Sequence, residues 1–138
     1  MSELPEVATV IFENDEGEIL AYLRDDNPSI PFPHYWDLFG GHVEKGDSAE
    51  EALMREIKEE LDIDLTDFTF FRKYVCREGD VRPNIKYVYS AKINKQVGEL
   101  DLKEGERLRF FKQNEIAKVK FANILKSIIL DYLKEKNA

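Results

Sequence analysis

Cysteine is almost absent from this chain, since Cys76 is the single one among 138 residues. A disulfide within the chain needs two cysteines and a cysteine-based zinc site needs more, so both are excluded. The preceding residues, Tyr74 and Val75, are types common in strands. We therefore expect the Cys76 thiol to be an inert packing group rather than a redox centre.

Long apolar runs are also missing from the sequence. No stretch approaches the roughly 18 apolar residues that a membrane-spanning helix needs. The N-terminal sequence MSELPEVATV lacks the basic start and the apolar core of a secretory signal. These absences predict a soluble, cytoplasmic protein without a membrane partner.

Basic residues are outnumbered by acidic ones. The chain has 20 Lys and Arg against 28 Asp and Glu, and its net charge is −8. A protein that binds nucleic acid through phosphate contacts normally carries a basic face, so this balance argues against a nucleic-acid partner. A small anionic substrate held through a metal ion remains open.

The hydrophobic content, 43% of 138 residues, is enough for one ordinary core. With no repeat, low-complexity tract or linker, residues 1–138 are predicted to form a single domain. Residues 25–33 hold three prolines, which predicts an extended loop beside the pocket. Patterns of apolar and β-branched residues predict strands over residues 7–12, 19–24, 68–76, 85–93 and 108–111.

In two other segments the apolar residues recur with the period of an α-helix. From residue 48, the apolar positions of one stripe are Ala49, Ala52, Leu53, Ile57 and Leu61. Asp47 or Ser48 can cap the N-terminus of this helix. Near the C-terminus, the residues of a second stripe are Phe121, Leu125, Ile128, Ile129 and Tyr132. This second stripe predicts an amphipathic helix packed on the sheet.

The first of these helices carries a dense group of carboxylates. Glu56, Glu59 and Glu60 are three and four residues apart, so they project within one arc of roughly 100°. Like charges so close repel one another, and a hard divalent cation with oxygen ligands would offset the repulsion. The plainer interpretation is a solvated acidic face. Arg55 within the cluster and Gly40-Gly41 ahead of the helix favour a functional site over that interpretation.

The segment from Gly41 to Ile63 resembles the signature of the Nudix hydrolase family, and of its MutT-like members. That signature is a Gly, five residues, Glu, seven residues, then Arg-Glu-aliphatic-any-Glu-Glu-any-Gly-aliphatic. Seven of its nine defined positions match in this chain. The lead-in from Trp36 to Gly41 is also similar. The resemblance implies an α+β fold, an α/β/α sandwich with a mixed β-sheet, and a phosphoanhydride hydrolase.

Two positions depart from the signature. Asp47 stands in place of Glu, so the carboxylate implied to hold Arg55 is one methylene shorter. Asp62 stands in place of the Gly at the helix end, where a left-handed conformation is common. A residue other than Gly costs on the order of 1 kcal/mol there, so we expect this departure to affect stability more than activity.

The resemblance also implies the roles of the site residues. The Gly41 carbonyl with Glu56, Glu59 and Glu60 would bind Mg²⁺, or Mn²⁺ in its place. Glu104, in a Glu-Gly step before the last strand, is implied to be either a further metal ligand or the general base, with a solvated loop acid as the plainer alternative.

Three residues are candidates for contacts with the substrate. Arg24 could contact phosphates, and Asn123, in an Ala-Asn step at the start of the last helix, could read a base or simply cap that helix. Tyr35 could stack on a base, as could Phe32, Trp36 and Tyr87. The basic residues near the central strands are expected to face solvent: Arg72, Lys73, Arg77, Arg82 and Lys86.

The predicted reaction is hydrolysis of a nucleoside diphosphate linked to a further group, X. The leading candidate substrate is a nucleoside triphosphate, oxidised or not, cleaved to the monophosphate and pyrophosphate. Sugar nucleotides and dinucleoside polyphosphates are further candidates. The alternative from another class is a nucleotide-binding or regulatory module with weak turnover, motivated by Asp47 and Asp62. Homodimers are frequent among similar proteins, so a homodimer is a further expectation.

Overall fold

A mixed β-sheet forms the centre of the protein in the computed structural model, which describes residues 4–138. Within those residues the sheet has seven strands, in the order β3-β2-β1-β6-β5, with β4 also paired to β1 and β7 to β2. Strands β1 and β6 run parallel, and the other pairings are antiparallel. The strands are β1 (Glu6–Glu13), β2 (Ile19–Leu23), β3 (Trp36–Asp37), β4 (Phe39–His42), β5 (Thr69–Cys76), β6 (Asn84–Lys92) and β7 (Arg107–Phe111).

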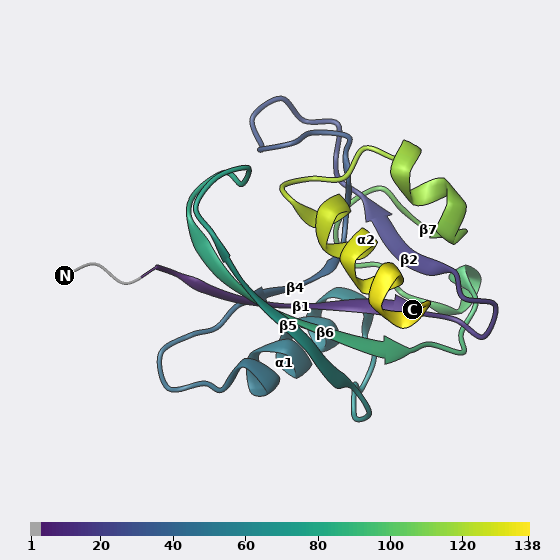
Figure 1. Ribbon diagram of the computed structural model, residues 1–138, viewed down its shortest axis with the longest axis horizontal. Helices are drawn as coiled ribbons and strands as arrows, with labels where there is room; N and C mark the ends of the chain where they lie inside the picture. Colours follow the sequence, from purple (N-terminus) through teal and green to yellow (C-terminus); the bar gives the residue numbers. More distant parts are fainter. Residues whose placement is uncertain (1–3) are drawn as a thin grey trace.

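Two α-helices cover opposite faces of this sheet, α1 (Ala49–Leu61) and α2 (Leu125–Lys136), as Figure 1 shows. Alternation along β1 divides the core between them, because Val10 and Phe12 pack with the α1 side whereas Ile11 packs with the α2 side. Short 3-10 helices cover residues Val97–Glu99 and Gln113–Lys118. The predicted α/β/α sandwich with a mixed sheet is confirmed.

The five predicted strands are present, each within two residues of its expected ends. Cys76 is buried in β5, as expected. Strands β3 and β4 were not predicted, because β3 is only two residues long and the two neighbouring glycines of β4 have a low strand propensity. Pairing with β1 imposes the extended conformation there, with Val10 opposite Phe39 and Ala8 opposite Gly41.

The caps at both ends of helix α1 agree with its sequence. The Ser48 hydroxyl accepts a hydrogen bond from the Glu51 N–H, and the Glu51 carboxylate accepts one from the Ser48 N–H, which completes a capping box. At the other end Asp62 is left-handed, with φ 54° and ψ 41°. The conformation normally taken by glycine is therefore kept without a glycine.

Replacing Asp62 with glycine should raise the free energy of unfolding by about 0.5–1 kcal/mol, because it removes the strain of a left-handed side-chain-bearing residue. The lost ion pair with Lys58, 3.1 Å apart and half exposed, offsets only a few tenths of this gain. Urea unfolding would measure the change. Asp64→Gly is the matched control, since Asp64 also pairs with Lys58 but has no positive φ. Equal stability of the two variants would contradict the prediction.

The C-terminal helix begins later than the apolar stripe suggested. Phe121 is buried but forms a bridge with Trp36 rather than a helical turn. Asn123 has a left-handed backbone, with φ 55°, and the N-cap is Ile124 without a side-chain hydrogen bond. The expectation that Asn123 starts or caps this helix was therefore wrong, because the chain turns at Asn123 before the helix can begin.

Among residues 4–138, neither helix has the length and apolar character needed to cross a membrane.

The expected exposure of the basic residues needs one correction. Lys86 is buried, because Asp80 on the β5–β6 loop pairs with its ammonium group at 2.5 Å. Arg72, Lys73, Arg77 and Arg82 are exposed.

Candidate active site

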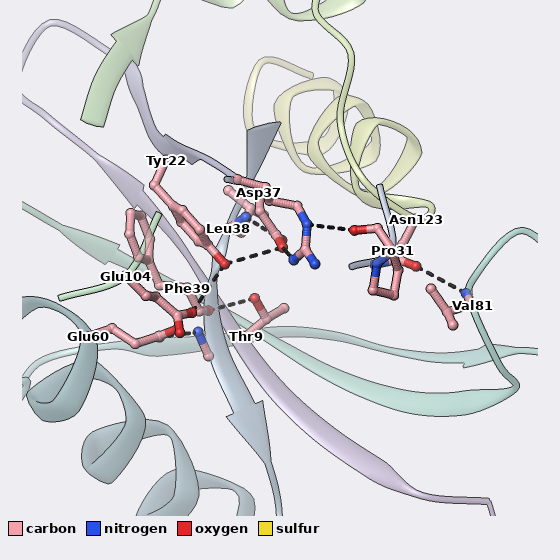
Figure 2. Close-up of polar contacts among 12 residues, drawn as sticks. Thr9, Tyr22, Pro31, Asp37, Leu38, Phe39, Glu60, Val81, Glu104 and Asn123 are labelled. Carbon is pink, nitrogen blue, oxygen red and sulfur yellow. Dashed lines mark hydrogen bonds and ion pairs between the residues drawn. The ribbon is translucent and has the colours of Figure 1, made fainter. Parts of the chain in front are cut away.

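Helix α1 and the loop before β7 bring carboxylates together beside strand β4. Helix α1 carries Glu56 and Glu60, strand β4 lies beside them, and the loop before β7 carries Glu104. Figure 2 shows the side chains of Glu60 and Glu104 next to each other, close to Phe39 of β4. The backbone holds the loop in place, because the Lys103 N–H donates to the Glu60 carbonyl at 2.9 Å.

Glu60 is the buried member of this cluster, with 8% of its surface exposed. Its carboxylate accepts a hydrogen bond from the Gly40 N–H at 2.8 Å. The pKa of Glu60 is raised to about 9, mainly by burial and also by the charges of Glu104 and Glu56, against the lowering effect of the Gly40 N–H. An acid in this environment favours either a proton or a cation nearby.

Glu56 lies directly against Gly41. A Cβ atom added to Gly41 would stand 2.0 Å from the Glu56 Oε1 atom, so only glycine leaves room for this carboxylate. Burial raises the pKa of Glu56, as does the neighbouring charge of Glu59, whereas Arg55 lowers it. Glu59 itself is exposed on the helix surface.

The Gly41→Ala variant should keep its fold and lose at least about tenfold in kcat/KM. The added methyl meets the end of a flexible side chain, which can rotate away, so the change in unfolding free energy should stay within about 1 kcal/mol. The rotated Glu56 carboxylate would then be misplaced by an ångström or more. Gly98→Ala is the control, because nothing lies within 4 Å of a Cβ there. A Gly41→Ala protein as active as Gly98→Ala would rule out a role for Glu56.

Arg55 and Asp47 form the pair that the signature implies. The Arg55 Nη1 atom lies 2.5 Å from the Asp47 Oδ2 atom, and Nη2 donates to the His42 carbonyl at 3.3 Å. The hydrogen bond that Arg55 donates to Asp47 raises the pKa of Arg55. Contact is therefore made despite the shorter carboxylate of Asp47, and the guanidinium ties the loop before α1 to β4.

Glu104 is positioned by residues that sequence reasoning did not identify. The Tyr22 oxygen lies 3.4 Å from both the Glu104 Oε1 atom and the Asp37 Oδ2 atom, so the two carboxylates share its single donor proton. Gly105 has a φ of +83°, and a Cβ there would stand 2.7 Å from the Leu23 carbonyl. This glycine lets the Glu104 loop approach β2 closely. Burial raises the pKa of Tyr22, as do the charges of Asp37 and Glu104, so its hydroxyl stays protonated as a donor.

Arg24 is held beside this cluster by Asp37. Its Nη1 atom donates to the Asp37 Oδ2 atom at 2.8 Å, and its Nε atom donates to the Pro31 carbonyl at 3.1 Å. Burial raises the pKa of Asp37, and the bond with Arg24 lowers it. Only two of the five guanidinium N–H groups are used in these contacts, so Arg24 can still donate to a ligand.

The remaining predicted substrate residues are Asn123 and Tyr35. The Asn123 Oδ1 atom accepts a hydrogen bond from the Val81 N–H at 3.2 Å (Figure 2). Tyr35 is half-buried, and its ring contacts that of Phe32 edge to face, with centroids 5.4 Å apart. Trp36 is half-buried, and its ring packs edge to face against that of Phe111, with centroids 4.8 Å apart.

A small cavity lies between these groups and the glycine pair of β4. Its volume is about 150 Å³. It is lined by Val7, Ala8, Thr9, Asp37, Leu38, Gly40, Gly41, Lys86, Asn123 and Leu125. Neither Tyr35 nor the loop 25–33 contributes to this lining. A larger hollow of about 430 Å³ lies beside the β1–β2 turn and contains none of the carboxylates of α1.

The sandwich, the glycine pair and the acidic helix together define a Nudix-type fold, and solved structures agree. The MutT protein from Methanosarcina mazei Go1 matches with a TM-score of 0.75 and 20% identity, over 100% of each chain. The NUDIX domain of Shewanella oneidensis NrtR, complexed with ADP ribose, matches with a TM-score of 0.79 and 13% identity, over 100% of this chain and 91% of that one. At these identities the likeness concerns the fold alone.

A NUDIX domain model matches residues 3–132, and the chain therefore belongs to the Nudix hydrolase family. Among curated proteins, the nucleoside triphosphatase NudI of Escherichia coli O139:H28 (strain E24377A / ETEC) is 47% identical over 51 residues, which are 37% of this chain and 35% of that protein. The chain thus matches about a third of the length of this relative.

Proposed function

We propose that this protein is a Mg²⁺-dependent Nudix hydrolase, able to use Mn²⁺ in its place, that cleaves a phosphoanhydride bond of a nucleoside diphosphate derivative. The environment of Glu60 carries the proposal. Its buried carboxylate is surrounded by the charges of Glu104 and Glu56, and within residues 4–138 no Lys or Arg pairs with it. A structural carboxylate would normally have a cationic partner, so the arrangement fits a site for a metal ion.

The donor set suits a hard cation. Carboxylate oxygens are the ligands that Mg²⁺ prefers, and Glu56, Glu59, Glu60 and Glu104, with the Gly41 carbonyl, would supply them. In the part of the chain that the structure describes, no three acidic, His or Cys side chains already stand close enough to hold an ion. Metal binding would therefore include rotation of the exposed Glu59 and Glu104 side chains. The bound ion would neutralise phosphate charge and lower the pKa of a water molecule.

The other site residues would hold the site in place or accept a proton during the reaction. Arg55, held by Asp47, restrains the loop before α1 against β4, so that Gly41 and Glu56 stay in contact. Glu104 is the candidate for a general base, because the Tyr22 hydroxyl orients its carboxylate and it lies on a loop open to solvent.

The leading substrate is a nucleoside triphosphate, cleaved to the monophosphate and pyrophosphate. The similarity to a nucleoside triphosphatase over 51 residues supports this choice. Arg24 would contact the phosphates with its free N–H groups, Asn123 would contact the base, and Tyr35 would lie at the rim of the site. The case for a catalytically weak binding module is reduced, since Asp47 reaches Arg55 and Asp62 takes the left-handed conformation.

The test is release of pyrophosphate or phosphate from nucleoside triphosphates, 8-oxo-dGTP, sugar nucleotides and dinucleoside polyphosphates, with Mg²⁺ or with EDTA. Turnover of one class that stops in EDTA and returns with Mg²⁺ is the expected result. Tight nucleotide binding without turnover of any compound would instead identify a binding module.

A further inference from the structure

A buried polar cluster links the β5–β6 loop to the segment that leads into α2. The Asp80 Oδ2 atom accepts from the Lys86 Nζ atom at 2.5 Å and from the Asn84 Nδ2 atom at 2.7 Å. The Asp80 Oδ1 atom accepts from the Ile124 N–H at 3.0 Å. The side chains of Lys86 and Asp80 are only 8% and 3% exposed. A charged pair at this depth keeps a defined geometry because each charge needs the other.

Lys86 borders the 150 Å³ cavity beside the glycine pair. On β6 it is opposite Val7 of β1 and two residues from Val88, which packs on the α2 side of the sheet. Its ammonium group has three N–H bonds. One is donated to Asp80 and one to the Asn84 Oδ1 atom at 3.0 Å. The third has no partner within residues 4–138 and is free for a ligand in the cavity.

Asn123 adds a second donor to the same cavity. The Val81 N–H can only donate, so the amide oxygen of Asn123 must face it, as Figure 2 shows. The Asn123 Nδ2 group therefore points away from Val81 and can donate to a ligand. It has no hydrogen-bond partner among the residues that the structure describes.

Two acceptor side chains that line the cavity, Asp37 and Thr9, already make hydrogen bonds. The Asp37 carboxylate accepts from the Leu38 N–H and from Arg24, each at 2.8 Å. The Thr9 hydroxyl donates to the Phe39 carbonyl at 2.7 Å, and although its oxygen can still accept, it is neutral. Among the polar side chains that line the cavity, Lys86 and Asn123 thus have an unused donor, and Lys86 carries a full positive charge.

We propose that this cavity binds the base of the substrate and that Lys86, with Asn123, selects a base with a carbonyl oxygen at the edge that faces them. The cavity has about half the smallest volume usual for a small-molecule pocket, so it suits one ring system rather than a whole nucleotide. Keto bases, such as hypoxanthine, guanine and uracil, would be preferred over adenine and cytosine. An amino group at this edge would meet donors and leave them unpaired. This inference rests on the hydrolase function proposed above.

Two substrate pairs isolate the keto group. ITP differs from ATP, and UTP from CTP, by a carbonyl in place of an amino group and the linked ring proton. With Mg²⁺ we expect kcat/KM to be at least about tenfold higher for the keto member of each pair, since buried donors reject a substrate without an acceptor.

Two variants test the residues. Asn123→Asp keeps size and can still accept from Val81, but it replaces the free donor with an acceptor, so the keto-to-amino ratio should fall at least about tenfold or invert. The double variant Asp80→Asn with Lys86→Met removes both buried charges together, which avoids an unpaired one, and should also lower the ratio. Arg82→Met, on the same loop but exposed, is the control and should leave the ratio unchanged.

The outcomes separate this inference from the function on which it rests. Turnover without a keto preference, or with an amino preference, overturns the inference and leaves the hydrolase intact. Absence of any turnover overturns the hydrolase, and calorimetric binding of IMP against AMP and of UMP against CMP in EDTA then decides the inference. Tighter binding of IMP and UMP supports it, and equal or weaker binding overturns it.

Discussion

The Glu60→Gln variant is expected to lose at least about 100-fold in kcat/KM while remaining at least as stable as the wild type. Gln keeps the shape of Glu and retains an oxygen that can accept from the Gly40 N–H, so the local structure should persist. The lost negative charge weakens the metal site, and several kcal/mol of transition-state stabilisation corresponds to a factor of this size. Steady-state kinetics at saturating Mg²⁺, paired with urea unfolding in EDTA, measures both effects.

The stability part of this result distinguishes a functional carboxylate from a structural one. At neutral pH the metal-free protein can keep Glu60 folded only with a buried charge or with a bound proton, and both cost free energy, so the Gln variant should have the higher free energy of unfolding. Glu51→Gln is the matched control on the same helix, because Gln also completes a capping box, and it should retain activity and stability. A Glu60→Gln protein that is fully active, or that unfolds easily, would contradict the assignment of Glu60 to a metal site.

In EDTA, the free energy of unfolding should fall as the pH rises from about 5 to about 9. The pKa of Glu60 is raised to about 9 in the folded protein from an ordinary value near 4.5. Between these values the folded state holds a proton that the unfolded state has lost, so increasing pH favours unfolding. The slope from this one group is at most about 1.4 kcal/mol per pH unit. Stability from Glu60 is thus complete below its unfolded pKa and is lost as the pH passes through its folded pKa.

Urea unfolding at a series of pH values would test this slope against the Glu60→Gln variant. The variant lacks the titrating carboxyl, so the difference between the two proteins isolates Glu60 from other groups with raised pKa values, such as Asp37 and Glu56. Mg²⁺ should flatten the slope of the wild type, because a bound cation stabilises the ionised carboxylate. Parallel pH profiles for the wild type and the variant in EDTA would show that Glu60 ionises normally.

Much of the local structure was predictable because it depends on near neighbours in the chain. The capping box of Ser48 and Glu51 and the stripe that includes Leu53 and Ile57 involve residues three or four apart, so periodicity alone predicts α1. The strand patterns of β1 and β2 are equally local. The left-handed Asp62 also agrees with its position at a helix end.

The partners of the site residues were less predictable because they come from distant parts of the chain. Tyr22 meets Glu104 across 82 positions, and nothing in either local sequence indicates the other. A Tyr on an alternating strand is an ordinary core pattern, so the orienting role of Tyr22 had no sequence signal. Strand β7 pairs antiparallel with β2. A predicted pairing of these two strands would have placed the Glu-Gly step before β7 near Tyr22, and this is the one hint that the sequence offered.

The sequence by itself determined the family, the sandwich and the face of α1 that carries Glu56 and Glu60, because helical spacing places side chains three and four apart on one side. Only the tertiary structure decided which groups surround those carboxylates and which polar residues enter the core. The sequence alone predicted that Lys86 faces solvent. In the structure Lys86 is buried, and Asp80 of the β5–β6 loop offsets its charge. Burial and pairing depend on how the whole chain packs, and no local pattern encodes them.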